Sequence, residues 1–257
     1  MAIPGKPKQA NDAMKPGRRE FMRTAGIAAA TLACVSIAAR TAAGAGGPRM
    51  KIGIIGSGRL GGTVGALWIK AGHEIMFSGL DLEEVRKLAA SLGPGAHAGT
   101  PREAAAFGEV VLVAVPYSAL PQIGRDLAGE LRGKVVLDAC NPVPGRDGDM
   151  AVAARAKGTG VASVEYLPGV RLVRAFNSVG TGILRSEAHR SGERIAIPLV
   201  ADDDAALKIA MRLVEDAGFE PLVVGALARA REFDAGTPMF GKGHTARELR
   251  RGLGMGS

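Results

Sequence analysis

The sequence predicts an α/β fold: a doubly wound, mainly parallel sheet covered by helices, with a short C-terminal extension. Three observations predict it. From Lys51 onward, short apolar runs alternate with helical patterns, the rhythm of strand–helix–strand units. The run Val110–Val115 is wholly apolar, as expected of a central strand buried on both faces. A glycine-rich turn joins the first expected strand to the first expected helix. We therefore expect one large domain at 50–225, preceded by a leader at 1–45 and followed by an extension at 226–257.

Eight segments have the length and apolar character of strands. The third is a brief extended piece, whereas the others are compact apolar runs bounded by turn residues. In chain order they are Lys51–Ile55, Glu74–Ser78, Ala96–Gly99, Val110–Val115, Val135–Asp138, Arg171–Ala175, Ile195–Val200 and Pro221–Val224.

The intervening segments show helical periodicity and recognisable ends. The first helix is stopped by Gly72, the second ends at Gly93-Pro94-Gly95, and the third begins with the capping-box pattern Thr100-Pro101-Arg102-Glu103. The expected helices are Leu60–Ala71, Leu82–Leu92, a short helix from Thr100, Leu120–Leu131, Met150–Ala156, Val161–Leu167, Asp203–Ala217 and Thr245–Leu253.

The turn after the first strand fits the pattern G-x-G-x-x-G at Gly56, Gly58 and Gly61. The first glycine permits a tight turn, the second lets a pyrophosphate approach the backbone, and the third lets the helix pack on the strand. Backbone N–H groups at a helix N-terminus bind phosphate. We therefore predict dinucleotide binding by Gly56, Ser57, Gly58, Arg59, Leu60 and Gly61.

The end of the second strand is where NAD and NADP are distinguished. A carboxylate there accepts hydrogen bonds from both ribose hydroxyls of NAD, whereas serine or arginine holds the extra phosphate of NADP. The chain has Ser78-Gly79-Leu80-Asp81, so Asp81 comes three residues late and no arginine occupies the turn. Arg86 and Lys87 are interpreted as a solvated helix face. We predict that Ser78 binds the adenosine end and that the cofactor is NADP, with NAD left open.

Three later loops leave strands at the edge where ligands bind in such sheets. Val115 and Pro116 follow the fourth strand, Asn141 follows the fifth and Asn177 follows the sixth. Val115, Pro116 and Asn141 are predicted to contact the cofactor, and Pro116, Asn141 and Asn177 to shape the cleft. Direct hydride transfer requires little beyond correctly placed rings, so no catalytic acid or base is assigned.

The first 45 residues are typical of a twin-arginine export signal. Arg18-Arg19-Glu20-Phe21-Met22-Arg23 precedes an uncharged stretch at 24–39, and Ala43-Gly44-Ala45 is a small-x-small cleavage pattern. The stretch is too short for a stable membrane span. We expect export by the twin-arginine machinery to the periplasm. Lipidation of Cys34 is the alternative.

Composition and residue spacing argue against nucleic-acid binding, a metal site and a redox-active thiol. The net charge is +8, but residues 1–45 hold seven basic and two acidic residues, which leaves 26 basic against 23 acidic. A nucleic-acid partner is therefore not expected. The four histidines show no ligand spacing, so no metal site is expected. After cleavage Cys140 is the only thiol; a buried, unreactive side chain is favoured over a redox role.

Several stretches together resemble one family. KIGIIGSGRLGGTVGALWIKAGHEIMFS, VVLVAVPYSAL, VVLDACNPVP, RLVRAFNSVG and GFEPLVVGAL are similar to the NADPH-dependent coenzyme F420 reductases, in order and from Met50 to about Leu253. The resemblance implies a Rossmann-like domain that passes a hydride between a nicotinamide and a flavin-like acceptor, F420 or FMN. The family's serine is usually followed by arginine, from which Gly79 and Leu80 depart.

The expectation is an exported NAD(P)H-dependent oxidoreductase acting on a small-molecule redox substrate, as a homodimer. Two alternatives remain. One is a ferric or quinone reductase using bound flavin, and the other is a non-catalytic dinucleotide-binding protein.

Overall fold

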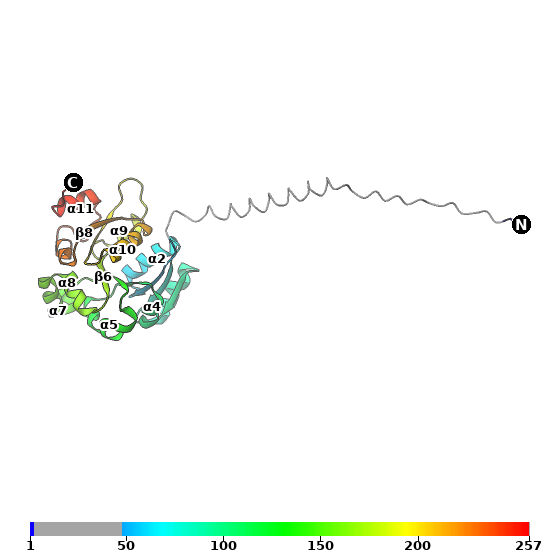
Figure 1. Ribbon diagram of the computed structural model, residues 1–257, viewed down its shortest axis with the longest axis horizontal. Helices are drawn as coiled ribbons and strands as arrows, with labels where there is room; N and C mark the ends of the chain where they lie inside the picture. Colours follow the sequence, from blue (N-terminus) through cyan, green and yellow to red (C-terminus); the bar gives the residue numbers. More distant parts are fainter. Residues whose placement is uncertain (3–47, 257) are drawn as a thin grey trace. The chain divides into compact units, whose positions relative to one another are not determined.

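The computed structural model describes residues 1–2 and 48–256, and residues 48–256 belong to one compact unit (Figure 1). The expected export signal, its cleavage site and Cys34 lie outside the described residues. No helix in the described part of the chain is long and apolar enough to cross a membrane.

The described residues form an eight-stranded sheet of order β3-β2-β1-β4-β5-β6-β7-β8. Strands β1 to β6 are parallel, β7 runs antiparallel to β6, and β8 runs parallel to β7. The predicted doubly wound, mainly parallel α/β fold is confirmed. The strands are β1 (Lys51–Ile55), β2 (Glu74–Ser78), β3 (Ala96–Gly99), β4 (Val110–Val113), β5 (Val135–Asp138), β6 (Arg171–Arg174), β7 (Ala196–Ala201) and β8 (Glu220–Gly225).

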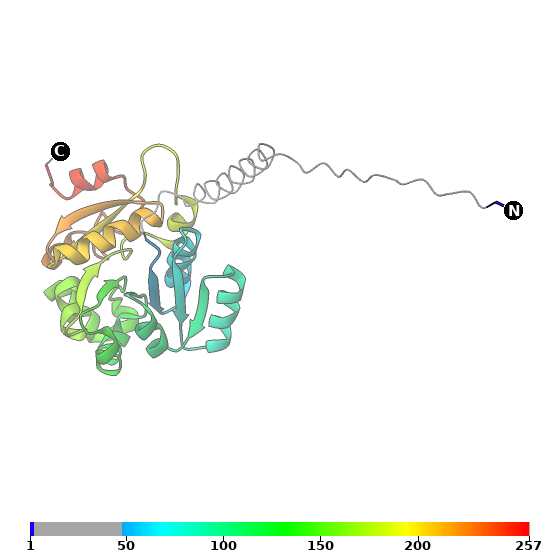
Figure 2. The same ribbon diagram turned by 45° about the vertical axis from the view of Figure 1, so that its right-hand side comes forward.

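Helices connect most of these strands and cover both faces of the sheet (Figures 1 and 2). They are α2 (Arg59–Lys70), α3 (Leu82–Leu92), α4 (Pro101–Phe107), the 3₁₀ turn η1 (Tyr117–Ala119), α5 (Leu120–Asp126), α6 (Ala128–Leu131), α7 (Pro144–Lys157), α8 (Thr159–Tyr166), α9 (Thr181–Ser186), α10 (Asp204–Asp216), η2 (Leu227–Glu232) and α11 (Ala246–Gly252).

The sheet separates two apolar cores. Helices α2, α3, α9 and α10 pack on one face, and α4 to α8, η2 and α11 on the other. Trp68 is the centre of the first core: its Nε1 donates to the Leu213 carbonyl at 2.7 Å, and its ring meets Phe176 edge-on at 5.8 Å. In the second core the hydroxyls of Tyr117 and Ser163 lie 3.2 Å apart.

Strand β7 overlaps β6 by only two residue pairs, Val173 with Ala201 and Arg174 with Val200. Since β7 begins at Ala196 and runs antiparallel, its first residues lie beyond the carboxyl end of β6. Strands β7 and β8 therefore project past the carboxyl edge of the parallel strands. Because β8 ends level with the end of β6, the C-terminal segment that follows Gly225 starts near that end.

Most element bounds differ from the sequence-based expectation by one or two residues, and some differences are larger. The fourth strand ends at Val113, the helix expected over 120–131 is two helices, and α9 was not expected. Helix α7 begins at Pro144 rather than near Met150 and contains a kink, because Gly148 has a φ of +59°. A six-residue helix such as α9 is too short for its periodicity to be recognised.

Candidate functional site

The glycine turn between β1 and α2 has three glycines with different surroundings. Gly56 has a φ of +98°, and a Cβ there would lie 2.4 Å from the Ala114 carbonyl oxygen. A Cβ on Gly61 would lie 2.0 Å from the Gly56 carbonyl oxygen. A Cβ on Gly58 would meet nothing within 4 Å. The first and third glycines are therefore required by packing, whereas the second borders open space in which a ligand can approach the backbone.

The start of helix α2 is available to an anion. The helix is 12 residues long, has no side-chain cap and has no acidic residue in its first turn. The N–H groups of Gly56 and Ser57 donate to the Ser78 carbonyl at 3.0 and 2.8 Å, so an anion would meet the amides from Gly58 into the helix. Uncapped amides and the positive end of the helix dipole favour phosphate here. The residues present thus fit the diphosphate of a dinucleotide.

The side chain of Ser78 does not face this space. It is fully buried, and its Oγ donates to the Ile54 carbonyl at 2.8 Å. The prediction that Ser78 binds the adenosine end is therefore wrong for its side chain; the residue instead ties β2 to β1. Asp81 is also engaged, since it caps α3 by accepting from the amides of Glu83 and Glu84. The Ser78 hydroxyl is therefore turned away from the cofactor side, and Asp81 Oδ1 is used as the helix cap.

The interpretation of Arg86 and Lys87 as a solvated helix face is consistent with the structure. Arg86 pairs with Glu83 and Lys87 with Glu84, one helical turn away, and all four side chains are largely exposed. By contrast, Arg59 is exposed beside the glycine turn.

The loop after β4 lies against the glycine turn. The Val115 side chain would be 2.8 Å from a Cβ placed on Gly56, and Pro116 is exposed at the start of η1. The ring of Tyr117 is not part of this surface, because it is fully buried in the second core. Burial raises the pKa of Tyr117 well above its usual value. Val115 and Pro116 are therefore the members of this loop that border the turn.

The structure brings Asn141 and Asn177 together, as the expected cleft requires. Asn141 Nδ2 donates to the backbone carbonyl of Asn177 at 2.8 Å. Asn177 is almost fully buried at 3% exposure. The residue before it, Phe176, adopts a φ of +60°, which is rare for a large side chain; it turns the chain sharply at the end of β6.

Three charged residues at this edge were not expected from the sequence as parts of the site. Arg174, fully buried on β6, donates to Asp138 Oδ2 and to Asp234 Oδ1, each at 2.7 Å. Asp138 ends β5, and Asp234 follows η2. The position of Arg174 inside a short apolar strand could have indicated a buried ion pair. Nothing in the sequence indicated that its partner is Asp234 in the C-terminal extension.

Cys140 lies beside this ion cluster and is buried. Its Sγ is 3.5 Å from the Val113 carbonyl. Burial, and then the negative charge of Asp138, raise the pKa of the thiol well above its usual value. The side chain is therefore a protonated packing group. Among residues 48–256 no three His, Cys, Asp or Glu side chains gather as metal ligands.

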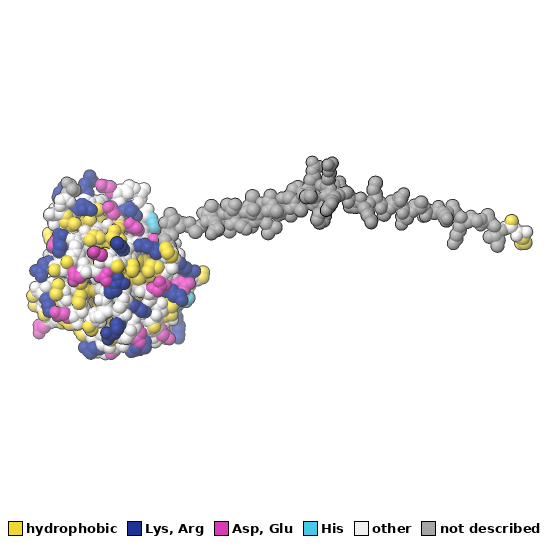
Figure 3. Space-filling model, in the orientation of Figure 1, with side chains coloured by type: hydrophobic (Ala, Val, Ile, Leu, Met, Phe, Trp, Pro, Cys, Tyr) yellow, Lys and Arg dark blue, Asp and Glu magenta, His cyan; other side chains and the backbone are white. Residues whose placement is uncertain are grey.

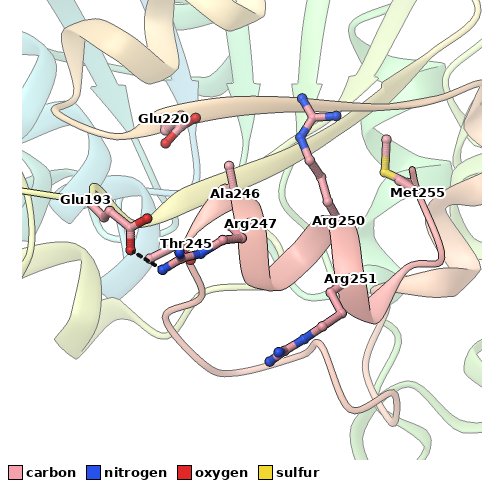
Figure 4. A pocket seen from close by; sticks show the side chains of 8 residues that line it. All are labelled: Glu193, Glu220, Thr245, Ala246, Arg247, Arg250, Arg251 and Met255. Atoms are coloured by element: carbon pink, nitrogen blue, oxygen red, sulfur yellow. Dashed lines mark hydrogen bonds and ion pairs between the residues drawn. The ribbon is translucent and has the colours of Figure 1, made fainter. Parts of the chain in front are cut away.

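Hollows on the surface of the described residues lie at the glycine turn and near the C-terminus. One, of about 380 Å³, runs from the glycine turn along α2 and is lined in part by Arg59, Lys70 and Arg185. The other, of about 600 Å³, lies between α11 and the outer edge of β8, where Arg250 and Arg251 are near the Arg247–Glu193 ion pair (Figure 4). Elsewhere, basic and acidic side chains are interspersed over the face seen in Figure 3.

Comparison with known proteins relates the first half of the domain to one family. A family model described as NADP oxidoreductase, coenzyme F420-dependent, matches residues 51–142. The matched stretch runs from β1 to the loop after β5, and so contains the glycine turn and Asn141. No curated protein matches the sequence.

Solved structures share the fold at low sequence identity. A hypothetical protein of Sinorhizobium meliloti superposes with a TM-score of 0.67 at 20% identity, covering 77% of this chain and 96% of its own. A candidate F420-dependent NADP reductase of Arthrobacter gives 0.58 at 20% identity, covering 71% and 87%. A pyrroline-5-carboxylate reductase of Coxiella burnetii gives 0.54 at 17% identity, covering 74% and 65%. At these identities the likeness shows the fold.

Proposed function

We propose that the protein is an NAD(P)H-dependent oxidoreductase that transfers a hydride between a nicotinamide cofactor and a flavin-like acceptor such as coenzyme F420 or FMN. The coarser assignment, an NAD(P)-dependent oxidoreductase, is supported by the family match over residues 51–142. The observation that carries the proposal is the glycine turn, where the missing Cβ of Gly58 leaves space beside an uncapped helix start.

The residues of the site have distinct tasks in this proposal. The amides from Gly58 to Leu60 would hold the diphosphate, with Arg59 adding a positive charge. Val115 and Pro116 would border the path of the cofactor along the carboxyl edge. The nicotinamide, when bound, supplies the hydride; the protein holds two rings face to face and excludes water. NADP is favoured over NAD because the matching family model is described as NADP oxidoreductase and because Asp81, between β2 and α3, is used as a helix cap.

Turnover with defined acceptors tests this function. Purified protein is mixed with NADPH and either F420 or FMN, and the nicotinamide absorbance at ~340 nm is followed. Loss of absorbance that depends on the acceptor supports the proposal. NADPH binding without turnover of either acceptor would instead support a non-catalytic dinucleotide-binding protein. Turnover only with a ferric or quinone acceptor would support a ferric or quinone reductase.

A variant at the turn tests the site itself. Gly58→Glu places a carboxylate where the diphosphate would lie, while the open space around this position leaves room for the side chain. We expect NADPH binding to fall below detection with an unchanged circular dichroism spectrum. If a folded Gly58→Glu protein binds NADPH as tightly as the parent, the proposed site is wrong.

We further propose export by the twin-arginine route to the periplasm, on the Arg18-Arg19 pattern. Because this route moves folded proteins, the cofactor would leave the cytoplasm already bound. Replacing both arginines by lysine should retain the protein in the cytoplasmic fraction.

A homodimer in solution is also proposed, and light scattering during size-exclusion chromatography tests it.

A further inference from the structure

One buried ion cluster joins the loops at the carboxyl edge to the C-terminal segment. The Arg174 guanidinium lies between Asp138 of β5 and Asp234, which is 60 residues later in the chain. The segment is also held by the amide of Gly241, which donates to the Ser178 carbonyl at 2.7 Å. The extension is thus bonded directly to the loop that carries Asn177.

The cluster fixes how two amide side chains are oriented. Asn141 is engaged at both ends: its Nδ2 donates to the Asn177 carbonyl at 2.8 Å, and its Oδ1 lies 3.4 Å from a nitrogen of Arg174. Asn177 Nδ2 donates to Asp234 Oδ1 at 3.2 Å. Since an ionised carboxylate can only accept, Asp234 requires Asn177 to turn its NH₂ group toward it and its carbonyl oxygen away.

This arrangement leaves one acceptor on each of two hydrogen-bonded residues without a hydrogen-bond partner among the described residues. They are Asn177 Oδ1 and Asp234 Oδ2, and both are shielded from solvent. Buried acceptors without a donor are rare and unfavourable, and each one calls for an explanation. A ligand that brings N–H donors to this point would satisfy them.

We propose that Asn177 accepts a hydrogen bond from the primary carboxamide of the nicotinamide, and that Asp234 is the positioning residue that presents its oxygen. This inference rests on the proposed function. A primary amide carries two N–H hydrogens on one nitrogen, and the two unpartnered acceptors belong to residues that are themselves joined by a 3.2 Å hydrogen bond. A cofactor anchored at Gly58 extends along the carboxyl edge, where Asn177 lies.

The inference changes the role expected for Asn141. Its side chain is used to hold the backbone of Asn177, so it supports the contact rather than making it.

The test compares NADP with its 3-acetylpyridine analogue, in which a methyl ketone replaces the carboxamide and removes both N–H donors. Affinities for the purified chain are measured by calorimetry, which needs no acceptor. We expect NADP to bind about tenfold more tightly, the size of one hydrogen bond. The adenosine, both riboses and the diphosphate are the same in the two ligands, so the ratio isolates the carboxamide.

Two variants and one control locate the effect. In Asn177→Ala the ratio should fall to about twofold or less, through weaker binding of NADP and unchanged binding of the analogue. Asp234→Asn should lower the ratio in the same way, because Asn177 is no longer held in one orientation. Glu232→Gln is the matched control: it removes a carboxylate two residues away that pairs only with Arg229, and the ratio should persist.

The outcomes separate the two claims. If the parent binds neither NADP nor its analogue, the proposed function fails, and this inference with it. If the parent binds both ligands equally, or if Asn177→Ala keeps the tenfold ratio, the inference alone is overturned. Should Asp234→Asn not fold, the parent and Asn177→Ala ratios still decide the role of Asn177.

Discussion

Arg174 is a fully buried guanidinium that lies between two carboxylates. Burial alone would lower the pKa of Arg174, but Asp138 and Asp234 raise it above its ordinary value, so the side chain is always charged. Asp138 also accepts from the Cys140 amide at 2.9 Å. Removing the cation would leave a buried carboxylate without its counter-charge.

Arg174→Met should therefore lower the free energy of unfolding by about 3–5 kcal/mol, the usual effect of breaking a buried ion pair. Urea unfolding followed by the fluorescence of Trp68, the single tryptophan, measures it. Arg171→Met is the control on the same strand: its pair with Asp203 is more than one-third exposed, so we expect a loss below about 1 kcal/mol. Equal losses would contradict the structural account.

Cys140 leads to a second prediction at the same scale. Because burial holds its pKa well above the usual value, the thiol is protonated at neutral pH and hidden from reagents. A disulfide reagent such as Ellman's should react with it only as fast as the protein unfolds, and immediately in denaturant. Rapid labelling of the native protein, with Cys34 replaced by serine, would contradict this.

At the scale of single residues, the sequence predicted which residue types lie near the site better than it predicted which way their side chains point. The glycines of the turn were identified because their spacing has a geometric cause. The side-chain direction of Ser78 was not predicted correctly, since strand residues alternate between faces and the sequence cannot say whether the last one points into the cleft or the core. Asn141 and Asn177 were predicted as site residues from their place after strands, and the structure brings them together. The ion cluster that orients them depends on Asp234, far away in sequence.

Among the elements, helix α2 and strand β1 show how close approach depends on a missing side chain. The backbone of Gly61 is so near the Gly56 carbonyl that a Cβ would lie 2.0 Å from its oxygen, well inside van der Waals contact. The helix can begin where it does only because position 61 is glycine. The direction of the helix start, and so of its free amides, follows from this contact.

Gly61→Ala should destabilise the protein by about 1–3 kcal/mol, the usual effect of overpacking, and weaken NADPH binding by shifting the turn. Gly129→Ala in α6 is the matched control, since a Cβ there meets nothing within 4 Å. It should stabilise the protein by up to about 1 kcal/mol through helix propensity. Thermal unfolding and NADPH titration measure both; a neutral Gly61→Ala would exclude the close approach.

Strands and long helices could be placed from the sequence because burial imposes a period on them. Strands β1, β2, β3 and β5, and helix α3, begin and end at the predicted residues. The break at Leu127 between α5 and α6 and the kink at Gly148 could not be predicted, because tertiary packing determines them. The reversal of β7 also leaves no local signal, since strand direction depends on where the chain has to return.

For the whole molecule, stability should depend on pH through His73, which joins the β1 side of the sheet to α10. Its ring is 3% exposed, lies 3.0 Å from Asp216 and accepts from the Met50 amide. Burial lowers the pKa of His73 below 6.5, more than the bond to Asp216 raises it. The unfolded chain therefore takes up a proton at a higher pH than the folded protein does.

Stability should fall as the pH drops below about 6.5, since it increases with pH wherever the unfolded state binds more protons. The contribution of one histidine cannot exceed about 1.4 kcal/mol per pH unit. Urea midpoints between pH 7.5 and 5.5 measure the slope, and His73→Gln should make it shallower. An unchanged slope in a folded variant would show that His73 does not cause it.

The reversal at β7 has a consequence for how this scaffold can vary. Because β7 and β8 run opposite to the other strands, their first residues lie on the same side of the molecule as the candidate site. The loop at 187–195, which leads into β7, therefore lies at the carboxyl ends of the parallel strands and not at their amino ends. An insertion in this loop would add chain on that side of the molecule, while the six parallel strands and the glycine turn keep their geometry.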